Sequence, residues 1–84
     1  MSNGWKQVKT HSNGWTLHAN RWHGSKEYRS PCGVFKIDQL RDRTWRLLRK
    51  STYRDGSPRW ESLHHTSRVA PCFRMAEEIK EEDQ

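Results

Sequence analysis

Hydrophobic and polar residues alternate along several short stretches of this chain, and this period of two predicts β-strands. The alternation is clearest over 15–20, where Trp, Leu and Ala share one face while Thr, His and Asn share the other. Asn13-Gly14 precedes this stretch, and such a pair favours a hairpin because both residues tolerate positive φ. We therefore predict strands over 5–9 and 15–20, and a third over 26–30.

A second hairpin is predicted in the middle of the chain. The stretch 45–50 carries apolar residues at both odd and even positions, which is typical of an interior strand with both faces covered. Asp55-Gly56 marks a turn, and the alternation resumes over 60–65 in the returning strand.

The segment 31–44 has an ambiguous pattern. Val34, Ile37 and Leu40 have the spacing of a helical face, whereas Phe35 and Ile37 also suit a strand. A glycine and two β-branched residues disfavour a helix. We predict a short strand or a single helical turn here.

A helix is predicted near the end of the chain, where apolar residues recur at i, i+3, i+4 and i+7: Cys72, Met75, Ala76 and Ile79. Thr66 or Ser67 is placed to cap its start. The acidic residues after Lys80 oppose the helix dipole, so we expect fraying there.

These elements predict one α+β domain over residues 1–84, with 1–4 and 81–84 frayed. We expect a small antiparallel sheet of three to five strands, with the C-terminal helix packed on one face. Trp5–Cys32 and Trp45–Cys72 echo each other, because both open on Trp and close on Pro-Cys. A weak internal duplication and a chance resemblance are both left open.

The composition makes the predicted interior small. Only 31% of the residues are hydrophobic, and Leu, Ile, Val and Phe together number 12 of 84. Five Trp residues compensate, because each indole buries about 150–250 Å². We therefore expect tryptophan rings, including Trp45 and Trp60, to fill the space between helix and sheet.

The charge is strongly uneven. The net charge is +6, but residues 1–76 carry 15 basic and 5 acidic groups, whereas 77–84 are acidic. A basic body attracts polyanions. No apolar run approaches the about 20 residues of a membrane span, and no leader pattern is evident, so we expect a cytoplasmic protein with reduced thiols and no membrane partner.

Candidate chemistry is sparse. His64, His65, Cys32 and Cys72 lack the close pairing of zinc ligands, and no group is present to orient a Cys–His nucleophile. A disulfide between the two cysteines would close a long loop but conflicts with a reducing compartment. We predict no enzyme activity, no metal and no cofactor.

Basic and aromatic residues interleave in the central hairpin, and this mixture suits phosphates and unpaired bases. The predicted nucleic-acid-binding residues are Arg41, Arg43, Arg46, Arg49, Lys50, Arg54 and Arg59. The leading hypothesis is a small basic module that binds DNA or RNA. The alternative is an adaptor or inhibitor that docks on an acidic surface of a larger complex. Brevity, high Trp content and high charge are also common in small accessory proteins of phages and mobile elements. A homodimer through open strand edges is also left open.

Overall fold

The computed structural model describes residues 4–82, which form six strands followed by one helix. Their bounds are β1 Trp5–Thr10, β2 Thr16–Asn20, β3 Lys26–Arg29, β4 Phe35–Gln39, β5 Trp45–Thr52, β6 Pro58–Thr66 and α1 Ala70–Glu82. Of the residues predicted to fray, 1–3 and 83–84 lie outside the described residues. The prediction is wrong for Glu81 and Glu82, because α1 continues to Glu82, and for Gly4, whose carbonyl accepts a hydrogen bond from Arg21 N–H.

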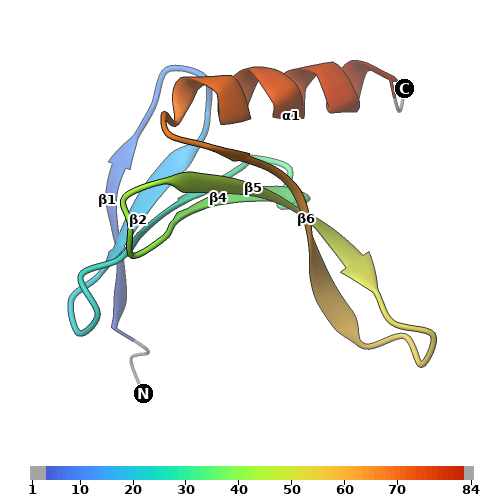
Figure 1. The fold of residues 1–84 in the computed structure, drawn as a ribbon, viewed down its shortest axis with the longest axis horizontal. Helices are drawn as coiled ribbons and strands as arrows, with labels where there is room; N and C mark the ends of the chain where they lie inside the picture. The colour runs from blue at the N-terminus through green and yellow to red at the C-terminus, as the bar shows by residue number, and fades with distance from the viewer. Residues whose placement is uncertain (1–3, 83–84) are drawn as a thin grey trace.

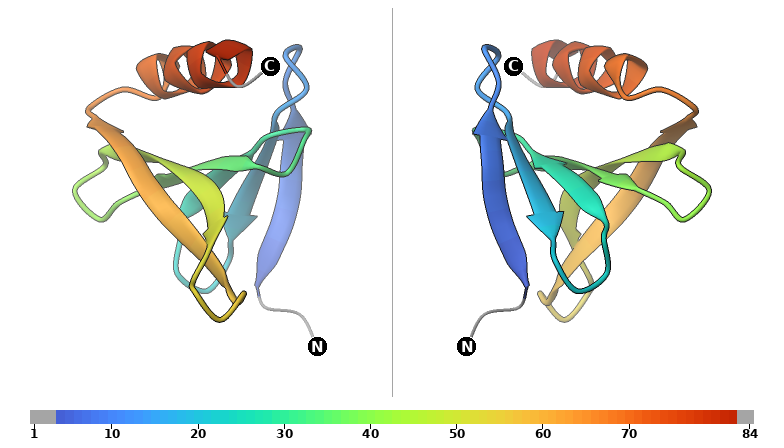
Figure 2. Two further views of the ribbon diagram at one scale, coloured as in Figure 1. Left: turned by 90° about the vertical axis from the view of Figure 1, so that its right-hand side faces the viewer. Right: turned by 90° about the vertical axis from the view of Figure 1, so that its left-hand side faces the viewer.

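The strands form one antiparallel sheet in which each is paired with its neighbours in sequence, in the order β1-β2-β3-β4-β5-β6. Helix α1 covers one face, and the sheet arches away from it, so that β1 and the β5–β6 hairpin descend on either side (Figure 1). The side views show the twist, because the edge strands β1 and β6 run in clearly different directions (Figure 2). The α+β class with a C-terminal helix is confirmed, but the sheet has six strands rather than three to five.

The extra strand is β4, within the segment whose pattern was ambiguous. Phe35 and Ile37 are buried on the face towards α1, and they pair with Arg49 and Leu47 of β5. Because β4 is hydrogen-bonded on both sides, its ladder outweighs the helical spacing of its apolar residues. As predicted, β5 is an interior strand: Leu47 is buried towards α1 and Leu48 towards the other face.

The core lies between the sheet and α1. Its buried members are Trp15, Phe35, Ile37, Leu47, Cys72 and Ala76. Phe73 extends the core through edge-on contacts of 5.0 Å with the rings of both Trp15 and Tyr28. The predicted helical stripe is confirmed, since Cys72 and Ala76 are buried and Met75 and Ile79 pack against the same cluster.

The tryptophans contribute less to the core than predicted. Only Trp15 is fully buried, and Trp45 packs half-buried against the cluster. Trp22 is 59% exposed and Trp60 is 38% exposed, so the prediction of a core role for Trp60 is wrong. The strand centres carry aliphatic residues and Phe, and these fill the interior instead.

The start of α1 also differs from the prediction. The helix begins at Ala70, and the carbonyl of Val69 accepts the first bond, from Cys72 N–H at 3.0 Å. Neither Thr66 nor Ser67 immediately precedes the helix. The echoed Pro-Cys pairs occupy different structures, because Pro31-Cys32 lies in a turn between strands whereas Pro71-Cys72 lies in the first turn of α1.

Candidate nucleic-acid interface

The seven basic residues predicted to bind nucleic acid do not form one surface. The structure divides them between the β4–β5 turn, the middle of β5, and the hairpin that joins β5 to β6. In that order the groups are Arg41 and Arg43; Arg46 and Arg49; and Lys50, Arg54 and Arg59.

The cations in the middle of β5 face carboxylates. Arg46 donates to both carboxylate oxygens of Asp38, at 3.2 and 2.7 Å, and this hydrogen bonding raises the pKa of Arg46. Arg49 lies 4.0 Å from the carboxylate of Glu61 on the adjacent strand. These two arginines are therefore engaged within the sheet. As predicted, Arg46 and Lys50 share one face of β5, but only Lys50 is left without a carboxylate partner among the described residues.

A cavity of about 840 Å³ opens between the β2–β3 and β4–β5 turns. These turns lie side by side because alternate turns of an antiparallel meander fall at the same end of the sheet. We call this space the turn cavity. It is lined by His23, Gly24, Ser25, Lys26, Gln39, Leu40, Arg41 and Arg43.

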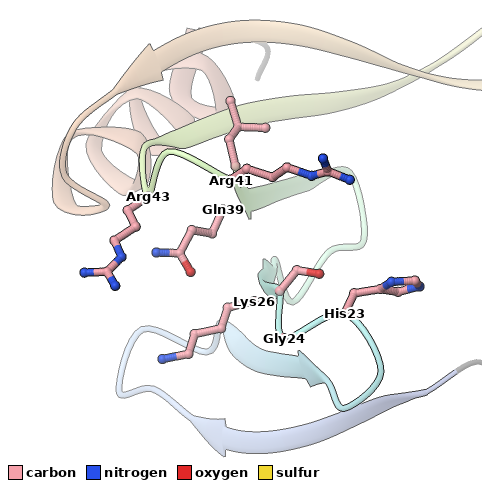
Figure 3. Close-up of a pocket in the computed structure, with 8 residues that line it drawn as sticks. His23, Gly24, Lys26, Gln39, Arg41 and Arg43 are labelled. Carbon is pink, nitrogen blue, oxygen red and sulfur yellow. The ribbon is translucent and has the colours of Figure 1, made fainter.

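The turn cavity is positively charged. Figure 3 shows the side chains of Arg43, Gln39 and Lys26 extending to one side of the gap, with those of Arg41 and His23 on the other. No lining residue carries a carboxylate, and within 4–82 none of the three lysine and arginine side chains forms an ion pair. The nearby carboxylate of Asp42 is turned towards Thr44, whose hydrogen bonds lower the pKa of Asp42.

The β2–β3 turn is held in shape by Asn20, which is 3% exposed. Its side-chain oxygen accepts hydrogen bonds from the backbone N–H groups of Trp22 at 2.9 Å and His23 at 3.0 Å. The carbonyl of Gly4 accepts a further bond, from Arg21 N–H at 3.0 Å. Because the backbone is fixed at these points, His23 reaches the cavity and the indole of Trp22 stays outside it in solvent.

At the opposite end of β5, residues 50–60 project beyond the rest of the sheet (Figure 1). Pairing with β4 ends at Arg49, apart from one bond from Lys50 N–H to Val34, so this segment is a two-stranded ribbon. We call it the arm. Its cations Lys50, Arg54 and Arg59 are exposed and form no ion pair within the described part of the chain. Arg59 stacks over Tyr53, with its guanidinium 5.5 Å from the ring centre.

Exposed aromatic rings lie near the cations of the turn cavity and near those of the arm. Trp22 belongs to the β2–β3 turn, while Tyr53 and Trp60 belong to the arm, and all three are at least 38% exposed. Lys36 lies 4.4 Å from the centre of the Trp60 ring. Side chains of this kind stack on unpaired bases.

The sheet face away from α1 is balanced in charge near its centre. Glu27, which is 7% exposed, accepts a 2.6 Å bond from Arg29, and its other oxygen lies 3.6 Å from Lys36. His18 lies beside this group and is 9% exposed; burial, followed by the charge of Arg29, lowers its pKa. This region therefore presents less unpaired positive charge to a polyanion than the two ends of β5 do.

The cysteines lie apart in the fold and are both free thiols. Cys72 lies on the buried face of α1, and burial raises its pKa. Partial burial opposes ionisation of the exposed Cys32, but hydrogen bonds from Ser30 and the Val34 backbone, with the charge of Lys80, lower its pKa overall. Within residues 4–82, no three His, Cys, Asp or Glu side chains gather in a metal-binding arrangement.

Three residues of this interface were missed from the sequence: Trp22, His23 and Lys26. They lie about 20 residues before Arg41 and Arg43, so nothing in the local pattern joins them. The sequence indicated their proximity only indirectly. If 35–39 is recognised as a strand, the β2–β3 and β4–β5 turns fall at the same end of the sheet.

Comparison of the chain with models of known protein families, with curated proteins and with solved structures finds no match. The helix formed by the described residues is too short and too polar to cross a membrane.

Proposed function

We propose that this protein is a small nucleic-acid-binding module whose phosphate contacts come from the turn cavity and the arm. The observation that carries the proposal is the set of unpaired cations gathered in these two places. Within residues 4–82 the strand carboxylates Glu27, Asp38 and Glu61 are close to basic partners, whereas six exposed cations of the turn cavity and the arm form no ion pair. Those cations are Lys26, Arg41, Arg43, Lys50, Arg54 and Arg59. Further unpaired cations, such as Lys6, Lys9 and Arg74, lie outside these two groups.

The spacing of the two groups suits a polymer rather than a small anion. β5 has eight residues, or roughly 26 Å at 3.3 Å per residue. One strand of a duplex has a phosphate every 3.4 Å, so this length matches about eight nucleotides. Oligonucleotides much shorter than this engage one group of cations at a time and lose the benefit of two linked contacts.

The same cations predict a defined salt dependence of binding. If all six contact phosphates, the logarithm of the binding constant falls with the logarithm of salt concentration with a slope of about −4 for single strands and about −5 for duplex DNA. The exposed rings of Trp22, Tyr53 and Trp60 add base stacking, which favours single strands over duplexes.

The test is fluorescence anisotropy with labelled single-stranded and duplex DNA and RNA 16-mers, and with single-stranded 3-mers, over a range of salt. We expect the 16-mers to bind at low salt with the slope above, and the 3-mers, which are too short to reach both groups, to bind markedly more weakly. A double substitution Arg41→Ala, Arg43→Ala or Arg54→Ala, Arg59→Ala is expected to lower the slope by about 1.5–2.

The matched control is Arg74→Ala, because Arg74 is also an exposed arginine but lies on α1, outside both groups. It should leave binding almost unchanged. Absence of binding by all four nucleic acids at low salt would reject the proposal and favour docking on an acidic protein surface.

A further inference from the structure

Two turns of this protein share an Arg-Asp pair at their second and third residues and are closed by the same hydrogen bonds. Leu40-Arg41-Asp42-Arg43-Thr44 joins β4 to β5, and Tyr53-Arg54-Asp55-Gly56-Ser57 joins β5 to β6. In each, the N–H of the fourth residue donates to the carbonyl of the first, at 3.0 and 2.9 Å, and the aspartate accepts from the fifth residue's N–H at 3.0 Å.

The two turns differ at the fourth residue, which must adopt a left-handed conformation. Gly56 has a φ of 87°, and Arg43 has a φ of 69°. The equivalent residues of two further turns, Gly14 and Gly33, are also glycines. Arg43 is the only non-glycine residue of the described chain with positive φ. A side chain is disfavoured in this region because its Cβ approaches the carbonyl oxygen.

The surrounding bonds hold Arg43 in this conformation. Leu40 N–H donates to the Thr44 carbonyl at 2.8 Å, which closes the hairpin. The Thr44 hydroxyl lies 2.6 Å from Nε2 of His65 on β6, so the turn is also tied to the neighbouring strand. Backbone strain that persists at one position, where a matched turn uses glycine, points to a role for the side chain.

That side chain reaches the turn cavity. Figure 3 shows Arg43 extending to the same side of the gap as Gln39 and Lys26, so a guanidinium, an amide and an ammonium group are presented together without a carboxylate. Planar guanidinium donors and a lysine suit the oxygens of a phosphate group. The start of α1 lies at this same end of the molecule, because β6, which leads into it, ends at Thr66 opposite Trp45. Glu77 and Lys80 lie instead near Asn13 and Pro31.

We propose that the turn cavity is a built site for a phosphate group, anchored by Arg43 at the expense of backbone strain, with Lys26 and Gln39 as its partners. This inference rests on the proposed function in taking the phosphate to be one in a nucleic-acid backbone. It goes further because it assigns one phosphate group to one defined site. Diffuse electrostatic attraction, by contrast, would not depend on any particular residue.

The strain is tested by a reciprocal exchange, Arg43→Gly and Gly56→Arg. A Cβ at Gly56 would meet no atom within 4 Å, so an arginine there adds backbone strain without a clash. We expect Gly56→Arg to lower the Tm and Arg43→Gly to raise it, each by roughly 2–6 °C. Arg41→Gly is the control: it removes a cation from the same turn without relieving a left-handed residue, so the Tm should fall.

The site is tested by titration with inorganic phosphate, followed through the backbone amide resonances of residues 39–43 by NMR. Saturable shifts are expected in the wild-type protein and should be lost in Arg43→Asn, since Asn tolerates left-handed φ but lacks the guanidinium. Shifts that do not saturate, or that persist in this variant, would overturn the phosphate site. A Tm that does not rise in Arg43→Gly would contradict the inferred backbone strain at Arg43.

The source of the phosphate is tested with the single-stranded 16-mer. We expect Arg43→Asn to weaken its binding and to lower the salt slope by about 0.7. Saturable phosphate binding without any nucleic-acid binding would reject the proposed function and keep the site as one for a small phosphate compound. Nucleic-acid binding that is equal in wild type and Arg43→Asn would keep the function and reject this site.

Discussion

The buried side-chain oxygen of Asn20 accepts a 2.9 Å hydrogen bond from the backbone N–H of Trp22, two residues further along the chain. The same oxygen holds His23 N–H at 3.0 Å, and Gly24 N–H donates to the Asn20 carbonyl at 2.8 Å. A single residue thus shapes the β2–β3 turn, one of the two walls of the turn cavity.

Replacement of Asn20 by Ala is predicted to destabilise the protein by about 1–3 kcal/mol, because two backbone N–H groups of the turn each lose a hydrogen bond that contributes about 0.5–1.5 kcal/mol. Urea unfolding followed by circular dichroism measures this. Asn20→Asp is the matched control, since it keeps an oxygen in the accepting position, and it should cost clearly less than Asn20→Ala. Equal losses in the two variants would show that the accepted bonds are not what stabilises the turn.

Trp22 is predicted to matter for binding but not for stability. Its side chain is 59% exposed, so Trp22→Ala should change the free energy of unfolding by no more than about 0.5 kcal/mol. If Trp22 stacks on an unpaired base, this variant should weaken single-strand binding by about 1–3 kcal/mol and leave duplex binding nearly unchanged. Trp22→Phe keeps an aromatic face and should retain most of the affinity. A parallel loss on duplex DNA would argue against stacking.

His18 is predicted to make the fold less stable in mild acid. Burial lowers its pKa in the folded protein below the usual 6.5, so the unfolded chain takes up a proton that the folded chain resists. Stability should therefore be highest above about pH 7.5 and fall as the pH drops through 6.5 towards the lowered value. His18→Gln keeps a group able to bond to Thr16, whose hydroxyl lies 2.8 Å from the His18 ring. Unfolding measured from pH 8 to 5 should show a weaker pH dependence in that variant; identical curves would refute the assignment to His18.

The two thiols are predicted to react at very different rates. Cys32 is exposed with a lowered pKa, whereas Cys72 is buried with a raised pKa, so iodoacetamide at pH 7 should modify Cys32 first and reach Cys72 only on unfolding. Mass spectrometry of the digested protein over time measures both rates. Fast modification of Cys72 in the folded protein would contradict its burial and revive the Cys–His nucleophile considered from the sequence.

The local patterns of the chain predicted most of the strands and the helix. Alternation over 15–20 and 60–65, and the stripe from Cys72 to Ile79, are properties of neighbouring residues and need no tertiary information. β4 was ambiguous for the opposite reason. Its five residues become a strand through hydrogen bonds with β3 and β5 on either side, and a short apolar run does not record those partners.

What the sequence alone determined is the class of the fold, the helix with its buried face, and a basic surplus concentrated between 41 and 59. Only the tertiary structure decided which of those cations remain unpaired, because ion pairs such as Arg46–Asp38 join strands through their register. It also brought Lys26 to Arg43, since the meander places alternate turns at one end of the sheet. Local patterning follows from the period of a strand or helix, whereas pairing of charges depends on which residues the folded backbone sets side by side.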